Sequence, residues 1–188
     1  MRIISGRARG LRLTVPKNYD VRPTGDRVKE SVFNIIGSRI IGADVIDLFA
    51  GTGNLGLESW SRGAASATFV DIEQESLRLV RSNITKCRAG ESCIVYKGGA
   101  EVLLPRLYAE GKRYDFAFCD PPYNKGWTGK IAAALAQYPV LKEGGYLIIE
   151  RSREEQLPDF AEGYETVRSS RYGDTVVDFV KYISAREK

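Results

Sequence analysis

The sequence contains no histidine. Histidine is the side chain that most often transfers protons near neutral pH, and it is a frequent ligand of catalytic zinc. Its absence excludes Ser-His-Asp hydrolysis and histidine-based acid or base catalysis. Any reaction of this chain must therefore use carboxylates, hydroxyls, backbone groups or an organic cofactor, and we expect no metal site.

Cysteines and long apolar runs are also scarce. The three cysteines, Cys87, Cys93 and Cys119, form no C-x-x-C pair, which argues against a zinc site or a disulfide framework. No apolar stretch approaches the roughly 20 residues that span a bilayer, and the first residues turn basic too soon for a signal peptide. We expect a cytoplasmic monomer without membrane contact, built as one domain over residues 1–188.

Acidic residues are few at the beginning of the chain. Residues 1–30 contain eight Arg and Lys against three Asp and Glu, a net charge of +5, whereas the whole chain carries +4. The excess of positive charge therefore lies entirely in this segment. Such a segment is either a solvated surface or a surface that binds nucleic-acid phosphates. The candidates for phosphate contact are Arg7, Arg9, Arg12 and Arg22.

Short β-rich runs alternate with helical stretches after residue 44. We expect five buried parallel strands, over residues 45–49, 67–71, 93–96, 114–119 and 145–150. Between the second and third of these runs, Leu77, Val80, Ile84 and Cys87 follow the spacing of one apolar helix face. The alternation predicts an α/β fold with a doubly wound, mostly parallel sheet and a ligand site beyond the carboxyl ends of the strands.

Both ends of the chain depart from this alternation. Two strand-like runs, 164–172 and 175–182, meet at Gly173-Asp174 and predict an antiparallel hairpin at the sheet edge. At the front, residues 3–4 and 11–13 flank a glycine-containing turn and predict a basic β-hairpin, followed by a helix over 26–36. We therefore expect an N-terminal extension over 1–43 and a core over 44–188.

A glycine-rich segment follows the first expected strand. Gly51, Gly53 and Gly56 fit G-x-G-x-x-G, which lets a nucleotide-like ligand approach the backbone. Asp71, 20 residues after Gly51, can accept hydrogen bonds from both ribose hydroxyls. These features suit a nicotinamide dinucleotide nearly as well as S-adenosylmethionine. Asp47 favours the latter, because its carboxylate would attract a sulfonium or ammonium group and repel a pyrophosphate.

Asp120-Pro121-Pro122-Tyr123 directly follows the fourth expected strand. The Asp120 carboxylate and the Pro121 carbonyl can accept the two N–H bonds of an exocyclic base amine and direct its lone pair at a methyl group. The prolines stiffen the loop, and Tyr123 offers a ring on which an extruded base can stack. This tetrapeptide is the strongest indication of function. Lys125 lies close enough in sequence to contact the same nucleic acid.

The sequence resembles the bacterial small-subunit rRNA guanine-N2 methyltransferases, the methyltransferase D type, over nearly its whole length. The resemblance rests on residues 2–6, 22–30, 47–56 and 120–123. It implies a seven-stranded, Rossmann-like class I methyltransferase fold whose last strands form a reversed hairpin. It further implies S-adenosylmethionine as the cofactor, and as substrate a guanine of 16S rRNA, either naked or in an assembling small subunit.

The resemblance also implies cofactor contacts by Thr24, Arg27 and Ile72, with Asp120 beside the cofactor. In the loop after the third strand, Gly99 stands where the family commonly carries an acidic or amide residue that contacts adenine. Glu101 or the backbone N–H of Ala100 are the two possible substitutes. An adenine-N6 methyltransferase is the second reading, because the same tetrapeptide serves both bases. A dinucleotide-dependent oxidoreductase and an RNA-binding module without catalysis are the remaining alternatives.

Overall fold

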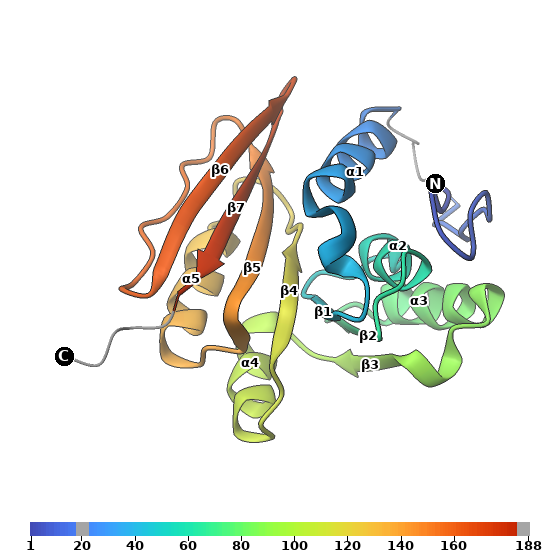
Figure 1. Cartoon of the computed structure of the whole chain (residues 1–188), viewed down its shortest axis with the longest axis horizontal. Coiled ribbons are helices and arrows are strands. Elements are labelled where there is room, and N and C mark those ends of the chain that lie inside the picture. Colours follow the sequence, from blue (N-terminus) through green and yellow to red (C-terminus); the bar gives the residue numbers. More distant parts are fainter. Residues whose placement is uncertain (18–22, 184–188) are drawn as a thin grey trace. The chain divides into compact units, whose positions relative to one another are not determined.

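The computed structural model describes residues 1–17 and 23–183, with the side chains of residues 23 and 24 excepted. The chain forms two compact units, Met1–Gly98 and Gly99–Lys188. Figure 1 labels the helices α1–α5 and the strands β1–β7. None of the helices in the described ranges is long and apolar enough to cross a membrane.

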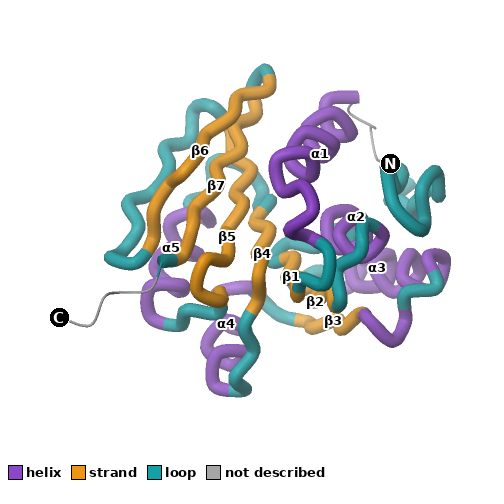
Figure 2. The backbone as a smooth tube through the Cα atoms, viewed as in Figure 1, coloured by secondary structure: helices purple, strands orange, loops and turns teal. Residues whose placement is uncertain are grey.

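The first unit contains three parallel strands and the helices that connect them. Its elements are α1 (Pro23–Ile36), η1 (Gly37–Ile40), β1 (Asp44–Asp47), α2 (Asn54–Ser61), β2 (Ser66–Asp71), α3 (Gln74–Cys87), η2 (Gly90–Ser92) and β3 (Cys93–Lys97). Within this unit the strand order is β3-β2-β1, and both neighbouring pairs are parallel. Figure 2 shows strand and helix alternating from β1 to β3, as the sequence predicts.

The core of this unit lies between β1, β2 and the apolar face of α3. The expected helix face is confirmed, because all four of its residues are buried. The strands differ, however, from the expectation that all are buried. Ile94 of β3 is 45% exposed, because β3 pairs only with β2 and forms an edge.

The second unit contains four strands and two helices. Its elements are α4 (Ala100–Ala109), β4 (Tyr114–Cys119), α5 (Trp127–Gln137), β5 (Leu141–Ser152), β6 (Tyr164–Tyr172) and β7 (Thr175–Tyr182). Their order within the unit is β4-β5-β7-β6, with β4 and β5 parallel and the other pairs antiparallel. The predicted C-terminal hairpin is therefore confirmed, and Gly173 at its turn has a φ of +62° that favours glycine.

Some boundaries differ from the sequence expectations. β5 begins at Leu141, four residues before the expected start, because Leu141 pairs with Tyr114 across an irregularity in the ladder. The N-terminal hairpin, residues 1–13, contains one isolated bridge between Arg2 and Arg12 in place of two regular strands. Figure 2 draws this segment as loop. Its reversal is nevertheless held by antiparallel backbone hydrogen bonds, including Ile3 N–H to the Leu11 carbonyl at 2.9 Å.

Candidate functional site

The glycine-rich segment forms the turn between β1 and α2. Gly51 and Gly53 have φ values of +54° and +81°, which residues with a Cβ rarely adopt. Gly56 is already inside α2, and a Cβ there would lie 2.3 Å from the Phe69 ring of β2. The first two glycines therefore shape the loop, and the third lets the helix pack closely on the strand.

Asp47 ends β1 beneath this loop and is 1% exposed. Its Oδ2 accepts a hydrogen bond from the Gly56 N–H at 3.2 Å, whereas Oδ1 is buried without a hydrogen-bond partner among the described residues. Burial raises the pKa of Asp47 to about 7, although backbone hydrogen bonds from Gly56 and Phe49 oppose the shift. A buried carboxylate with a vacant acceptor position fits a cationic group such as the ammonium of S-adenosylmethionine.

Asp71 ends β2 and holds the glycine loop in place. Its Oδ2 accepts the Gly51 N–H at 2.8 Å, and its Oδ1 accepts the Glu73 N–H at 2.9 Å. The sequence predicted that Asp71 contacts the ribose, but it did not predict that Asp71 also holds the glycine loop. The spacing of 20 residues from Gly51 to Asp71 does not by itself reveal that hydrogen bond. Each oxygen retains a lone pair for a ribose hydroxyl. The next residue, Ile72, is 61% exposed and presents an apolar surface beside this carboxylate.

The second unit begins with the segment that should contact the adenine ring. Gly99 precedes α4, and the Glu101 carboxylate folds back over it. A Cβ at Gly99 would lie 2.8 Å from Glu101 Oε2, so this carboxylate occupies the space that a side chain at position 99 would fill. Glu101 Oε2 is buried and has no hydrogen-bond partner among the described residues. Ala100 is buried beside it.

The Asp120–Tyr123 tetrapeptide leaves the end of β4. Asp120 and Pro122 are exposed, whereas Pro121 is buried. The Tyr123 hydroxyl donates a hydrogen bond to Glu150 Oε1 at 2.8 Å and lies 3.3 Å from the Thr175 hydroxyl. Burial raises the pKa values of both the Tyr123 hydroxyl and the Glu150 carboxyl. The ring is thus held from its hydroxyl end by β5 and β7.

The loop after the tetrapeptide has an anchor that sequence reasoning missed. Glu155 accepts the Asn124 N–H at 3.2 Å with one oxygen and the Thr128 hydroxyl at 3.1 Å with the other. Asn124 has a φ of +58°, a conformation that Asn tolerates better than most residues. Lys125 lies exposed in the loop between them. No short motif marks Glu155, because the contact joins residues about 30 positions apart.

The predicted nucleic-acid contacts of the first unit are on its surface. Arg7, Arg9 and Arg12 are exposed on the N-terminal hairpin, and the Arg7 guanidinium lies 4.6 Å from the centre of the Trp60 ring. Arg27, which was predicted to contact the cofactor, is exposed on α1. The predicted contacts at Arg22 and at the Thr24 side chain fall outside what the structure describes.

The fold is that of the class I S-adenosylmethionine-dependent methyltransferases, with a seven-stranded, mostly parallel sheet that ends in an antiparallel hairpin. Residues 1–181 match the family described as Conserved hypothetical protein 95. The chain belongs to this family.

Individual relatives are similar over most of their length. The chain is 36% identical to YlbH of Bacillus subtilis strain 168, provisionally named an rRNA methyltransferase, over 96% of this chain and 98% of that protein. It is 33% identical to ribosomal RNA small subunit methyltransferase D of Escherichia coli K12, over 84% and 78% of the two chains. The solved structure of the Escherichia coli protein yhhF, provisionally named a methyltransferase, superposes with a TM-score of 0.87 at 30% identity, over 99% of both chains.

Proposed function

We propose that this protein transfers the methyl group of S-adenosylmethionine to the exocyclic N2 of a guanine in 16S rRNA. The observation that carries the proposal is the Asp120–Tyr123 tetrapeptide at the end of β4, with its aromatic ring fixed by Glu150. The family assignment supports an rRNA substrate. We propose that the whole chain acts as one methyltransferase domain.

The tetrapeptide supplies what a poorly nucleophilic amine needs. An exocyclic amine loses nucleophilicity because its lone pair is delocalised into the base. The Asp120 carboxylate and the Pro121 carbonyl would accept its two N–H bonds, and these bonds strengthen as the nitrogen becomes pyramidal. The base would stack on the Tyr123 ring, while the Pro122 ring restricts the backbone of the turn.

The cofactor provides a methyl group on a sulfonium centre. In the transfer, a bond forms from N2 to the methyl carbon, the carbon–sulfur bond breaks, and its electron pair stays on sulfur in S-adenosylhomocysteine. The amine then loses one proton, and the Asp120 carboxylate is placed to accept it and pass it to water, because this side chain is exposed. The reaction thus balances without a metal or a histidine.

The residues proposed to bind the cofactor have distinct roles. Asp47 would bind the ammonium group through its vacant Oδ1, the Gly51–Gly56 loop would lie against the cofactor, and Asp71 would accept the ribose hydroxyls. Glu101 would accept the adenine amine in place of the side chain that Gly99 lacks. Thr24, Arg27, Ile72 and Ala100 are assigned cofactor contacts from the family resemblance alone.

The RNA would be bound by phosphate contacts on the first unit and beside the tetrapeptide. The exposed Arg7, Arg9 and Arg12 on the hairpin supply positive charge, as does Lys125 after the tetrapeptide. Arg22 is assigned to the same surface from sequence. Methylation of adenine N6 would use the same tetrapeptide, so analysis of the methylated base must distinguish guanine N2 from adenine N6.

Two measurements test the proposed function. Calorimetry should show binding of S-adenosylhomocysteine and none of NAD or NADP. Mass mapping of rRNA methylated by the purified protein should then place the methyl group on guanine N2. Binding of a nicotinamide dinucleotide without S-adenosylhomocysteine would make the protein an oxidoreductase, and a methyl group on adenine N6 would support the second reading.

Asp120→Ala should separate chemistry from binding. It removes the acceptor whose hydrogen bond strengthens in the transition state, so we expect single-turnover methyl transfer to fall by a factor on the order of 10² or more at saturating cofactor. Affinity for S-adenosylhomocysteine should change little. Near-normal turnover, or a methyl group on a ring carbon, would contradict the mechanism.

A further inference from the structure

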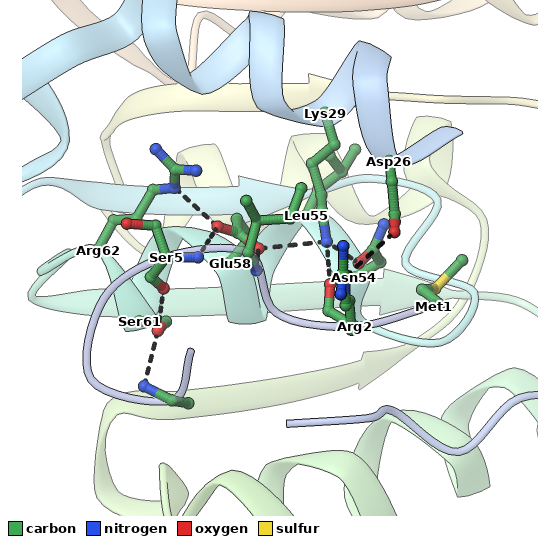
Figure 3. Close-up of polar contacts among 12 residues, drawn as sticks. Met1, Arg2, Ser5, Asp26, Lys29, Asn54, Leu55, Glu58, Ser61 and Arg62 are labelled. Atoms are coloured by element: carbon green, nitrogen blue, oxygen red, sulfur yellow. Dashed lines mark hydrogen bonds and ion pairs between the residues drawn. The ribbon is translucent and has the colours of Figure 1, made fainter. Parts of the chain in front are cut away.

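A buried ionic cluster lies beneath the N-terminal hairpin (Figure 3). The side chains of Lys29 on α1 and Glu58 on α2 are 2% and 0% exposed, and Lys29 Nζ lies 3.2 Å from Glu58 Oε2. A buried ion pair is often no more stabilising than apolar residues of similar volume, because desolvation opposes the attraction. Neither residue belongs to the cofactor or tetrapeptide sites, so their hydrogen bonds must indicate what they do.

Glu58 binds the backbone of the hairpin. Its Oε2 accepts the Ile4 N–H at 2.8 Å and its Oε1 accepts the Ser5 N–H at 3.1 Å. Oε1 also accepts the Arg62 Nε–H at 2.7 Å. Two of the donors to this carboxylate are therefore main-chain amides of a segment that has almost no β-ladder of its own.

Lys29 connects the same hairpin to the start of α2. Its ammonium donates to the Arg2 carbonyl and to Asn54 Oδ1, both at 2.6 Å. Burial lowers the pKa of Lys29, and the neighbouring Glu58 carboxylate opposes that shift. Asn54 is the first residue of α2 and directly follows Gly53 of the glycine loop. The hairpin backbone is thereby tied to the turn on which the cofactor should lie.

A second connection runs through Asn83 of α3, whose side chain is buried. Its amide nitrogen donates to the carbonyls of Thr14 and Thr52, at 2.9 and 2.8 Å, and its oxygen accepts the Thr14 N–H at 2.7 Å. Thr14 directly follows the hairpin, and Thr52 lies between the first two loop glycines. Both ends of the hairpin are thus hydrogen-bonded to groups that also touch the loop or its helix.

The turn of the hairpin sits directly on the end of α2. The Arg7 N–H donates to the Ser61 carbonyl at 2.8 Å, and the Ser61 hydroxyl donates to the Ser5 carbonyl at 2.6 Å. A Cβ at Gly6 would lie 1.8 Å from the Ser61 carbonyl oxygen, so only glycine permits this contact. Gly10, in the same hairpin, has the same φ of +84°, but a Cβ at that position would have nothing within 4 Å.

We propose that Lys29 and Glu58 are positioning residues that hold the N-terminal hairpin as a preordered RNA-binding arm, fixed relative to the glycine loop. The inference rests on the proposed function, because the ligand of the arm is the phosphate backbone of the RNA substrate. A segment ordered in advance loses less conformational entropy when RNA binds. The arginines then meet the phosphates at a set distance from the cofactor loop.

Gly6→Ala and Gly10→Ala form a matched pair that tests the seating of the arm. Both impose the same left-handed strain, but only Gly6→Ala collides with Ser61. We expect Gly6→Ala to weaken binding of a 16S rRNA fragment by about tenfold or more, since the arm must then be ordered by RNA, with S-adenosylhomocysteine affinity within about twofold of wild type. Amide hydrogen exchange at Ile4 and Ser5 should accelerate in parallel. Gly10→Ala carries the backbone strain without the collision, so it should change all three quantities less than Gly6→Ala does.

Lys29→Met/Glu58→Met tests the ion pair itself. Removing both charges leaves neither Lys29 nor Glu58 buried without its partner. Arg62 also loses the Glu58 carboxylate, but its side chain is 15% exposed to solvent, so thermal unfolding should stay cooperative. The Ile4 and Ser5 amides lose their acceptor, and we expect faster exchange and weaker RNA binding with unchanged cofactor affinity. If the ion pair served stability alone, the double variant would have a changed melting temperature, but its RNA affinity would not fall while its cofactor affinity stayed unchanged.

Arg9→Glu/Arg12→Glu distinguishes failure of this inference from failure of the proposed function. If this pair weakens RNA binding while Gly6→Ala behaves as Gly10→Ala does, the arm binds RNA but its docking does not matter, and the inference is wrong. Unprotected Ile4 and Ser5 amides in the wild-type protein would overturn it as well. If the arginine pair has no effect, the arm does not bind RNA, and both the inference and that part of the proposed function fall.

Discussion

Asp47 shows how a single buried residue can make cofactor binding depend on pH. Its pKa is raised from 3.8 to about 7, so in the cofactor-free protein the carboxyl is largely protonated below pH 7. In the unfolded chain it ionises at the ordinary value. Ionising it in the folded state is therefore unfavourable, and this residue's contribution to stability is present below about pH 4 and lost as the pH rises through 7.

Cofactor affinity should show the opposite trend, because an ammonium group binds the ionised carboxylate. We expect S-adenosylhomocysteine binding to weaken below pH 7, approaching about tenfold for each further pH unit. Isothermal titration from pH 5.5 to 8.5 measures this. Asp47→Asn should bind more weakly at pH 8 and lose the slope. A wild-type affinity that is flat across pH 7 would argue against a direct contact between Asp47 and the ammonium group.

Glu101 is proposed to contact the adenine amine in place of a side chain at position 99. Two substitutes for Gly99 were open from sequence, and the structure favours the carboxylate, since it lies over Gly99 with a vacant Oε2. A hydrogen bond to a charged acceptor contributes about 1.5–3 kcal/mol, so the wild-type protein should prefer S-adenosylhomocysteine over its 6-oxo analogue by roughly tenfold or more. Glu101→Ala should bind both with similar affinity. If Glu101→Ala retained the preference, the Ala100 N–H would be the better candidate.

At the residue scale, sequence reasoning found groups that lie in motifs and missed those that act through distant contacts. Asp47 and Asp71 each end a strand and Asp120 directly follows one, and strand ends are recognisable from the apolar run that precedes them. Glu150 and Glu155 were missed because their partners are about 30 residues away along the chain. The involvement of Glu58 was equally invisible, since a helical Glu normally indicates a solvated surface.

At the scale of elements, the alternation of strands and helices was predictable because each has a distinct apolar period. The helix 74–87 shows its buried face directly, and the hairpin 164–182 is marked by Gly173-Asp174. The start of β5 at Leu141 was not predictable, because pairing with β4 continues past Gly144-Gly145. The N-terminal hairpin was expected to have regular strands, but it contains one isolated bridge, and Glu58 of α2 accepts the Ile4 and Ser5 N–H groups.

Gly56 tests the packing of α2 against β2. Gly56→Ala would place a methyl group 2.3 Å from the Phe69 ring, so we expect a loss of about 1–3 kcal/mol in the free energy of unfolding and weaker S-adenosylhomocysteine binding. Adding Phe69→Leu removes the ring and should recover part of the loss, which denaturant titration of the four variants would reveal as coupling. Gly129→Ala is the control, because this glycine of α5 has open space around its Cβ position.

At the scale of the whole molecule, charge is divided more unevenly than the modest net value suggests. Residues 1–30 carry a net charge of +5, whereas the whole chain carries +4. In the structure, Arg7, Arg9 and Arg12 of that segment are exposed on a hairpin that is held by the buried Lys29 and Glu58. A solvated surface of this composition needs no such anchoring. The asymmetry was evident from sequence, whereas the anchoring that distinguishes a binding arm from a mobile tail required the structure.

Salt dependence decides whether this charge binds RNA phosphates. Each phosphate neutralised by an Arg releases counterions, so binding weakens with salt, with a log–log slope of about 0.7 per contact for single-stranded RNA. Arg9→Glu/Arg12→Glu should therefore weaken RNA binding, and it should flatten the slope by up to about 1.4 if both residues contact phosphates. Fluorescence anisotropy between 50 and 300 mM salt, roughly the range in which such contacts are lost, measures this slope. Lys112→Glu, an exposed charge reversal beyond α4, serves as the control and should leave the slope near wild type. A slope unchanged by the arginine pair would mean that the hairpin is solvated surface and that RNA is bound elsewhere.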